Sequence, residues 1–346
     1  MVYSATYPST NSSVVAFSPF VVKQLGFVAV GLIVMVLVAS ADYRLLHAGA
    51  YGIYALALLL LAVVFVVGHG QSEWGSQRWI DLKLFPLQPS EIAKPALVLA
   101  LARYFSDHQS NARSIRHLAG SFLLALPAFL LVYAQPDLGT SASFLFIWFL
   151  MALVGGTRLL YLGLTGGLAL AALPVIWSLL KDYMRDRITI FLHPESDPWG
   201  QGYNIIQAQI SIGSGGMWGR GFLAGTQSQG HFLRIQHSDF IFSVLAEEMG
   251  FVGGLALFLL FFILLSRILR VAHLSRDAFG RLVAAGIAVT LLFSVSVNVA
   301  ANVRLMPVTG IPLTFISYGG SSMITNLASL GMIQSILMRR KRFLRP

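Results

Sequence analysis

The sequence predicts an all-α, polytopic membrane protein, organised as a single integral membrane domain over residues 1–346. Hydrophobic residues make up 56% of the chain and charged residues only 11%, whereas a soluble domain is about 25% charged. The mean hydropathy is +0.73, and apolar runs of roughly 17–25 residues, the length of a transmembrane helix, recur along the chain. The absence of cysteine excludes disulfide bonds and zinc–thiolate sites.

Nine apolar runs are the expected membrane spans. The third is the least apolar, because it opens with the polar sequence QPSEIAK and closes at Arg103. An odd number of spans places the two termini on opposite sides of the membrane. We expect the spans near residues 17–40, 45–69, 88–105, 117–134, 138–156, 159–181, 239–265, 282–303 and 320–338.

The distribution of basic residues predicts a cytoplasmic C-terminus. With that orientation, the net charge of +10 falls on the cytoplasmic face, where it complements anionic lipid, and residues 182–238 form an extracytoplasmic loop. A pI near 10.1 therefore does not indicate nucleic-acid binding. The basic residues assigned to the cytoplasmic side are Arg44, Arg103, Arg113, Arg116, Arg158, Arg267, Arg270, Arg276, Arg281, Arg339, Arg340, Lys341, Arg342 and Arg345.

The segment 191–250 is polar and rich in glycine between apolar spans. A loop of this length without secondary structure is unusual unless it is functional or disordered, and its many aromatic residues argue against disorder. It ends at Ser238 and Asp239, where the chain re-enters the membrane beside His237. Asp239 is therefore the first candidate for chemistry; the alternative is that Ser238 and Asp239 cap the helix that follows.

A second set of candidates opens the third span. Glu91 and Lys94 lie three residues apart, so a helix places both on one face. They form either an ion pair that stabilises the bundle or the wall of a polar cavity in which Lys94 meets an anion. The run from Gln88 to Glu91 is typical of a helix start, with Ser90 near the cap. Upstream, Arg78 is either an interfacial anchor or a substrate-binding cation.

Three further acids are candidates, one at a helix end and two within a span. Asp137 lies at an outer corner, either to cap the helix that begins at Leu138 or to serve a site. Glu247 and Glu248 lie deeper in the seventh span. We expect one of the two to face a polar interior or a cation, and the other to be neutral through desolvation.

Two glycine-rich runs would allow a ligand or another part of the chain to approach the backbone closely. The run from Gly213 to Gly221 either binds phosphate through its amides or forms a glycine turn packed within the protein. Ser317 opens a second glycine-rich run at the last span. The eight histidines show no metal-binding spacing, and the chain lacks nucleotide-binding and serine-hydrolase motifs.

Several of these segments together resemble the SEDS (shape, elongation, division, sporulation) family of bacterial cell-wall synthesis. The matching segments occur in the family's order over essentially the whole chain, and residues 225–229 resemble its elongation branch, RodA. The segments are GSQRWIDL (75–82), QPSEIAK (88–94), QPDLGTS (135–141), FLHPESDPWGQGYNIIQ (191–207), IGSGGMWGRG (212–221), HSDFIFSVLAEEMG (237–250), PVTGIPL (307–313) and SYGGSS (317–322).

The resemblance implies a SEDS-type bundle of ten spans in the bacterial cytoplasmic membrane, so a first span is expected to be missing before the nine. It implies a peptidoglycan glycosyltransferase that polymerises lipid II into β-1,4 glycan strands on the outer face during cell elongation. The implied partners are a class B penicillin-binding protein, the elongation machinery and membrane lipid. Asp239 takes the place of the essential aspartate, and Glu91, Lys94 and Asp137 that of polar cavity residues. Arg78, Gln88, His237 and Ser317 complete the candidate substrate-binding residues.

A mechanism with Asp239 as general base fits these residues, since an attacking sugar hydroxyl must lose its proton. Lys94, Arg78 or a divalent cation (Mg or Mn) of unknown ligands holds the leaving pyrophosphate, and no nucleotide is needed. Alternatives are a lipid II flippase and a non-enzymatic scaffold for a penicillin-binding protein.

The chain departs from the family pattern at three places. Arg234-Ile235-Gln236 stands where a Pro-Glu-containing run is usual, so no role of that glutamate carries over. Arg304 stands where glycine is common, and Thr314 where proline is common. These departures bear on the expected local loop geometry but not on the expected role of Asp239.

Overall fold

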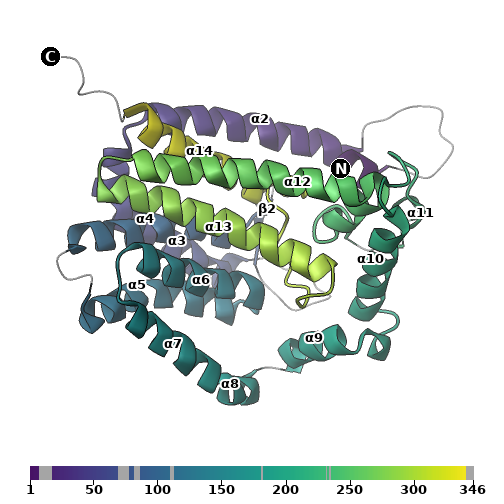
Figure 1. The fold of residues 1–346 in the computed structure, drawn as a ribbon, viewed down its shortest axis with the longest axis horizontal. Coiled ribbons are helices and arrows are strands. Elements are labelled where there is room, and N and C mark those ends of the chain that lie inside the picture. The colour runs from purple at the N-terminus through teal and green to yellow at the C-terminus, as the bar shows by residue number, and fades with distance from the viewer. Residues whose placement is uncertain are drawn as a thin grey trace. The chain divides into compact units, whose positions relative to one another are not determined.

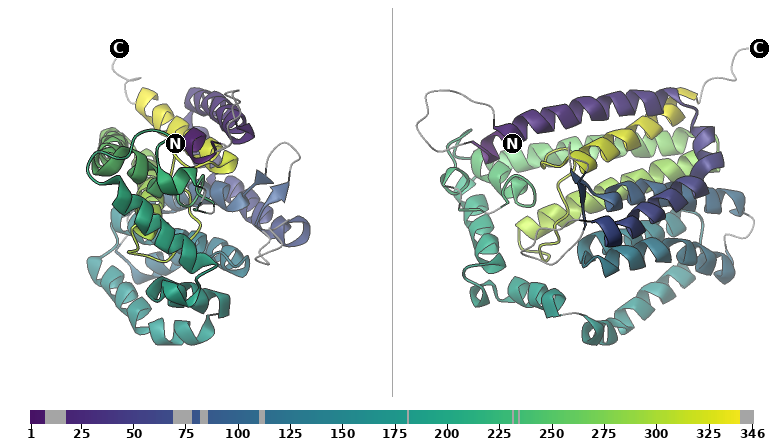
Figure 2. Two further views of the ribbon diagram at one scale, coloured as in Figure 1. Left: turned by 90° about the vertical axis from the view of Figure 1, so that its right-hand side faces the viewer. Right: turned by 180° about the vertical axis from the view of Figure 1, so that it is seen from behind.

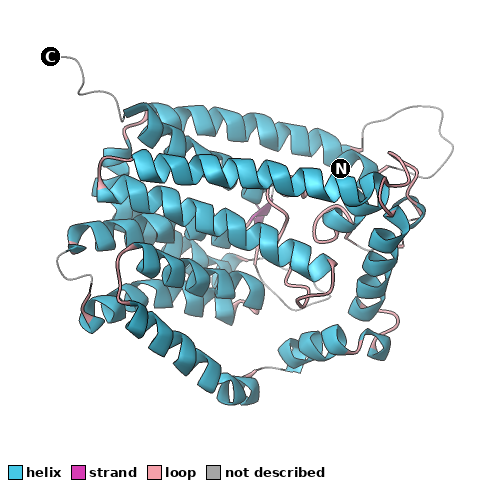
Figure 3. Ribbon diagram, in the orientation of Figure 1, coloured by secondary structure: helices cyan, strands magenta, loops and turns pink. Residues whose placement is uncertain are grey.

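The computed structural model describes residues 1–7, 18–68, 78–81, 86–109, 113–180, 182–230, 232–233 and 235–339. Within those residues the chain is almost entirely helical (Figures 1 and 3). The two strands found there, β1 (Ile80–Asp81) and β2 (Pro86–Leu87), form a short antiparallel pair.

The connections between helices vary in length, and the segments 68–88 and 303–319 are among the longer ones. In chain order they are α1 (Val2–Ala5), α2 (Pro19–Ser40), α3 (Tyr43–Val67), α4 (Pro89–Asp107), α5 (Ile115–Ala134), α6 (Leu138–Val154), α7 (Leu159–Ala171), α8 (Leu173–Leu179), α9 (Asp182–Leu192), the 3₁₀ helix η2 (Pro194–Ser196), α10 (Gln201–Gly215), α11 (Thr226–Gln229), α12 (Ile241–Leu274), α13 (Ala278–Asn302) and α14 (Gly320–Arg339).

Each expected span coincides with one of these helices, except that α7 and α8 divide the sixth. Five helices, α2, α3, α5, α12 and α13, are long and apolar enough to cross a membrane by length and composition. The helix α6 is apolar but shorter, while α4 and α14 carry more polar residues. The prediction of a polytopic helical membrane protein is confirmed.

The chain forms two compact units. The first comprises Met1–Phe27, Val175–Leu264 and Ser294–Gly319. Its core is built by the start of α12 and the end of α13, where Ile241, Val244, Leu245 and Val295 are buried together with Leu313. This unit contains Asp239.

The second unit comprises Val28–Pro174, Leu265–Phe293 and Gly320–Pro346. Its centre is α4, which packs along α3 and against α5 and α6 (Figure 2). Most of α4 is buried, including Leu97, Leu101 and Phe105. Glu91 and Lys94, in the polar first turn of α4, are buried as well.

The segment expected as a long loop contains helices of its own. The helices α9, η2, α10 and α11 lie between residues 182 and 229 (Figure 1). In α10, Ile205 and Ala208 are buried at a spacing of three residues, which is a helical pattern. Trp199 and Trp218 are instead exposed, at 83% and 81%.

Candidate functional site

The backbone of Asp239 is fixed by two asparagines on α13. The side-chain amides of Asn298 and Asn302 both donate to the backbone carbonyl of Asp239, at 3.1 and 2.9 Å. The two asparagines are four residues apart, so they share a helix face, and they are 2% and 1% exposed. Two buried donors on one carbonyl leave the start of α12 little freedom.

The carboxylate of Asp239 is half-buried just before α12 begins. The Ser238 hydroxyl donates to Oδ1 at 2.7 Å. On the other side, Gly310 lies so close that a Cβ there would be 4.0 Å from Oδ2. The oxygen Oδ1 of Asn302 accepts from the Ser243 amide at 3.2 Å, so a residue of α13 caps this first-turn amide.

His237 and Ser317 lie beside the aspartate. The Ser317 hydroxyl donates to the Ser238 carbonyl at 2.6 Å and accepts from the Leu313 amide at 2.9 Å, so it ties the segment before α14 to the aspartate loop. The His237 ring packs against Tyr318, with ring centres 5.7 Å apart. Burial lowers the pKa of His237, and the negative charge of Asp239 opposes this shift. His237 is therefore neutral near pH 7.

In the second unit, Glu91 and Lys94 form an ion pair. Lys94 Nζ lies 2.7 Å from Glu91 Oε1, and the side chains are 7% and 4% exposed, respectively, for Lys94 and Glu91. The expected helix start over Gln88–Glu91 is confirmed: Gln88 is the N-cap, Pro89 is the first helical residue and Ser90 follows it. The backbone amide of Gln88 donates to the Ser321 hydroxyl at 3.0 Å.

Arg78 and Asp137 come together as a second pair. Arg78 Nη1 lies 3.6 Å from Asp137 Oδ2. Asp137 also caps α6, since its Oδ1 accepts from the Thr140 amide at 3.1 Å. Arg78 Nε donates to the Gln135 carbonyl at 3.1 Å, which orients the guanidinium. Capping and ion pairing thus coexist at Asp137.

The candidate residues therefore fall into two groups. Asp239, His237 and Ser317 belong to the first unit, and the two ion pairs with Gln88 belong to the second. Each group is assembled from segments far apart in sequence. That both groups serve one substrate stays a prediction.

The described residues offer no ready metal site. No group of three or more histidine, aspartate or glutamate side chains gathers among them to hold an ion. Glu91 is neutralised by Lys94, and Asp137 by Arg78. No step of the reaction is assigned to a metal ion.

Glu247 and Glu248 both bind the segment 223–228, and Glu248 also accepts from the Ser4 hydroxyl of α1. Both are buried, at 0% and 2% exposure. Glu247 accepts from the amides of Gln227 and Ser228 at 2.8 and 2.9 Å, and Glu248 accepts from the Leu223 amide at 3.2 Å. Neither forms an ion pair with a described cation. Of the two expected environments, the polar interior is confirmed for Glu247, because backbone amides and the Thr226 hydroxyl bind its carboxylate.

The glycine run is a turn packed against α12. The amides of Arg220 and Gly221 donate to the carbonyls of Glu247 and Glu248, each at 3.0 Å. Gly219 has φ of +79°, and a Cβ there would lie 2.1 Å from the Glu248 carbonyl oxygen. Because the amides of residues 219–221 are engaged within the protein, the packed turn is confirmed and these three amides are not free to bind phosphate.

Two of the residues that depart from the family pattern have left-handed backbone. Arg304 has φ of 57° and Ile235 has φ of 56°. Arg304 thus adopts the conformation that glycine takes without strain, at a cost of about 1–2 kcal/mol. Its Nη2 donates to the Leu192 carbonyl at 3.2 Å. Thr314 is buried at 2% exposure, and Arg234 lies outside the described residues.

Three polar residues escaped the sequence reasoning. Asn298 and Asn302 anchor Asp239, and Gln24 donates to the Ser317 carbonyl at 3.3 Å. All three lie in segments assigned only as spans. Polar side chains at membrane depth are by default candidates for a functional role. The two asparagines, four residues apart in a span, could therefore have been recognised from the sequence.

Fold and site together define a multi-pass helical membrane protein with a fixed aspartate at the end of a span. Over residues 1–342 the sequence matches the FtsW/RodA/SpoVE family, described as cell cycle proteins. Peptidoglycan glycosyltransferase MrdB of Escherichia coli K12 is 43% identical over 324 residues, which cover 92% of this chain and 86% of the relative. Stage V sporulation protein E of Bacillus subtilis 168 is 35% identical, covering 97% and 92%.

Solved structures agree. One that describes structural coordination of polymerization and crosslinking by a peptidoglycan synthase complex has a TM-score of 0.80 and 35% identity, covering 93% of this chain and 90% of that one. The crystal structure of rod shape determining protein RodA from Thermus thermophilus has a TM-score of 0.68 and 33% identity, covering 95% and 91%. The chain belongs to the FtsW/RodA/SpoVE family.

Proposed function

We propose that this protein polymerises lipid II into β-1,4-linked glycan strands, with Asp239 as general base. The enzyme class follows from the family and from the name of the Escherichia coli relative, peptidoglycan glycosyltransferase MrdB. The chain is therefore a peptidoglycan glycosyltransferase of the bacterial cytoplasmic membrane. The lipid-linked substrate and the residue roles are our proposal. The observation that carries it is the half-buried Asp239 carboxylate, set just before an apolar helix with its backbone fixed by α13.

The reaction moves one proton and releases one charged group. The 4-hydroxyl of the acceptor sugar loses its proton to Asp239 as its oxygen attacks the anomeric carbon of the donor. The bond between that carbon and the pyrophosphate breaks, and undecaprenyl pyrophosphate leaves. Attack from the opposite face inverts the α-linkage to β. Asp239 then releases its proton to water.

Lys94 and Arg78 are the proposed pyrophosphate-binding cations, since positive charge stabilises a leaving anion. Each already pairs with a carboxylate, at 2.7 Å for Lys94 and 3.6 Å for Arg78. Substrate must therefore either displace Glu91 and Asp137 or bind each pair as a unit. In the second case the carboxylates accept hydrogen bonds from sugar hydroxyls.

The proposed partner is a class B penicillin-binding protein of the elongation machinery. A new glycan strand must be crosslinked, which is a different chemistry from its polymerisation. A solved structure that this chain resembles concerns a complex that coordinates the two. That similarity supports the partner.

The test uses the purified full chain with lipid II, alone and with its penicillin-binding partner. Long glycan strands support the proposal. Headgroup translocation in vesicles without polymer would indicate a flippase, and the lack of both would indicate a scaffold; either result contradicts the proposal. Parallel reactions with Mg²⁺, Mn²⁺ or a chelator measure the cation requirement. Asp239→Ala should bind lipid II without polymerising it.

A further inference from the structure

A cavity at the predicted cytoplasmic ends of the helices in the second unit contains an excess of positive charge. Its volume is about 120 Å³, enough for a phosphoryl group. It lies where α3 and α13 begin and where α12 and α14 end. Its lining residues are Tyr43, Arg44, Ser275, Arg276, Asp277, Ile336 and Arg339.

Two of the three arginines here have no carboxylate partner among the residues that the structure describes. Arg44 and Arg276 are exposed and form no ion pair with any described residue. The carboxylate of Asp277 instead accepts from the Tyr43 hydroxyl at 2.9 Å and the Ser275 hydroxyl at 3.3 Å. Among the described residues neither guanidinium group forms an ion pair, and Asp277 is the one carboxylate in the lining, so the lining keeps a net positive charge.

The third arginine shapes the cavity. Arg339 donates to the carbonyls of Ala39 and Ser40 at 3.1 and 2.6 Å, and lies 3.6 Å from Asp42. It thereby caps the end of α2 and fixes α14 beside it. Arg339 is a structural residue, so we assign ligand binding to Arg44 and Arg276 alone.

We propose that this cavity binds the phosphoryl group of an anionic phospholipid in the cytoplasmic leaflet. Guanidinium groups match phosphoryl oxygens in a planar, bidentate geometry. Basic pockets between membrane helices on the cytoplasmic side suit anionic headgroups. Leu45 and Met338 follow and precede the lining residues Arg44 and Arg339 in sequence and are 68% and 56% exposed, so exposed apolar side chains that could meet acyl chains occur at the same helix ends. Free phosphate could not use that surface.

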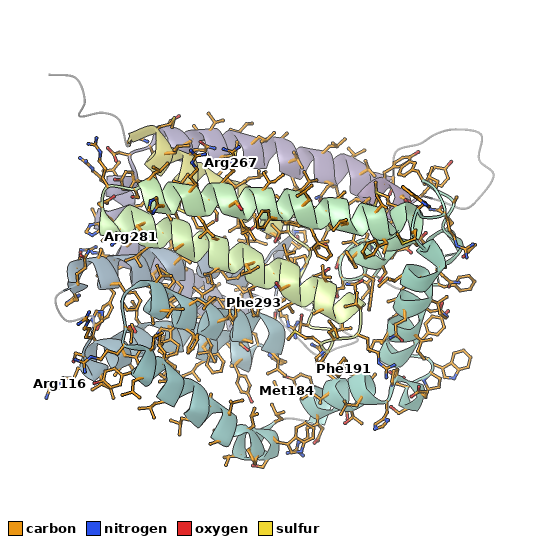
Figure 4. All side chains as sticks on the ribbon, viewed as in Figure 1. Arg116, Met184, Phe191, Arg267, Arg281 and Phe293 are labelled. Atoms are coloured by element: carbon orange, nitrogen blue, oxygen red, sulfur yellow. The ribbon has the colours of Figure 1, made fainter. Side chains whose placement is uncertain are left out.

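The test removes both cations of the cavity and compares a matched pair elsewhere. The variant R44Q/R276Q loses two cytoplasmic charges from the cavity lining. The control R267Q/R281Q loses the same charge from exposed positions of α12 and α13 that do not line the cavity (Figure 4). Both are purified as full chains, stripped of lipid and titrated with phosphatidylglycerol, and binding is measured by native mass spectrometry.

We expect wild type and control to retain one phosphatidylglycerol with similar affinity, and the cavity variant to bind it roughly 20-fold more weakly. Phosphatidylcholine should not compete. Equal loss in both variants would show diffuse attraction and overturn the proposal. Displacement by inorganic phosphate at the same concentration would assign the site to a free anion instead. R44K keeps the positive charge but lacks the planar guanidinium group. If this variant folds normally and binds phosphatidylglycerol more weakly, bidentate recognition is supported.

Discussion

Two side-chain amides converge on the backbone carbonyl of Asp239. Asn302 has a second task, since its Oδ1 accepts from the Ser243 amide at 3.2 Å and from its hydroxyl at 2.6 Å. A proposed general base must be positioned well, because small displacements of a catalytic group can reduce a rate by about 100-fold. We therefore regard Asn298 and Asn302 as positioning residues.

Replacing Asn302 by leucine should affect both stability and rate. It leaves the Ser243 hydroxyl without its buried acceptor and removes one of the two donors to the Asp239 carbonyl, which lowers the free energy of unfolding by about 1–3 kcal/mol. The polymerisation rate should fall roughly 10- to 100-fold with little change in lipid II binding. Asn326→Leu on α14 is the control, and equal rates in the two variants would refute the positioning role.

The pH dependence of stability should report His237. In an unfolded chain the imidazole gains a proton near pH 6.5, whereas burial lowers its pKa in the folded protein. Below pH 6.5 the unfolded state thus binds more protons, and stability falls. His237→Phe retains the ring contacts without a titrating group. Its melting temperature should fall less than that of wild type between pH 7.5 and 5.5, and identical losses would contradict the pKa shift.

At the scale of elements, the glycine turn and the start of α12 form one packed structure. Gly219 and Gly250 both have positive φ, at 79° and 66°, and each lies too close to the other for a Cβ. The carboxylate of Glu247 binds the first amides of α11 and so holds the rest of the segment.

Gly219→Ala should loosen this structure. The left-handed backbone costs an alanine about 1–2 kcal/mol, and the new Cβ would also displace the Glu248 carbonyl. Gly213→Ala is the matched control, because a Cβ there meets nothing within 4 Å. Limited proteolysis should cut the 215–230 segment faster in the first variant only. Equal cleavage of both would contradict the packing described.

The helices were predictable because membrane spans can be recognised by their length and hydropathy. The run expected at 138–156 is α6 at Leu138–Val154, capped by Asp137 as one alternative held. Local spacing likewise predicted the pairing of Glu91 with Lys94. The segment after residue 182 was less readable, because its glycines hide the helical pattern of α10. The anchoring of Asp239 depends on asparagines about 60 residues away, which no local pattern encodes.

At the scale of the whole molecule, the orientation in the membrane rests on charge. Residues 182–238 are predicted to lie outside and the turn between α12 and α13 inside. The chain has no cysteine, so single cysteines can report each side. A membrane-impermeant maleimide added to intact cells should label Trp199→Cys, which is exposed, and should label Arg281→Cys only after lysis. The reverse pattern would invert the topology.

The most direct test of the account is the polymerisation rate of Asp239→Asn with its partner at saturating lipid II. The amide keeps the size of the side chain but cannot take a proton, so the rate should fall at least about 100-fold while lipid II binding and melting temperature stay near wild type. Glu195→Gln removes one charge from an exposed position of the same segment and should polymerise normally. Wild-type rates from folded Asp239→Asn would remove Asp239 from the role of base.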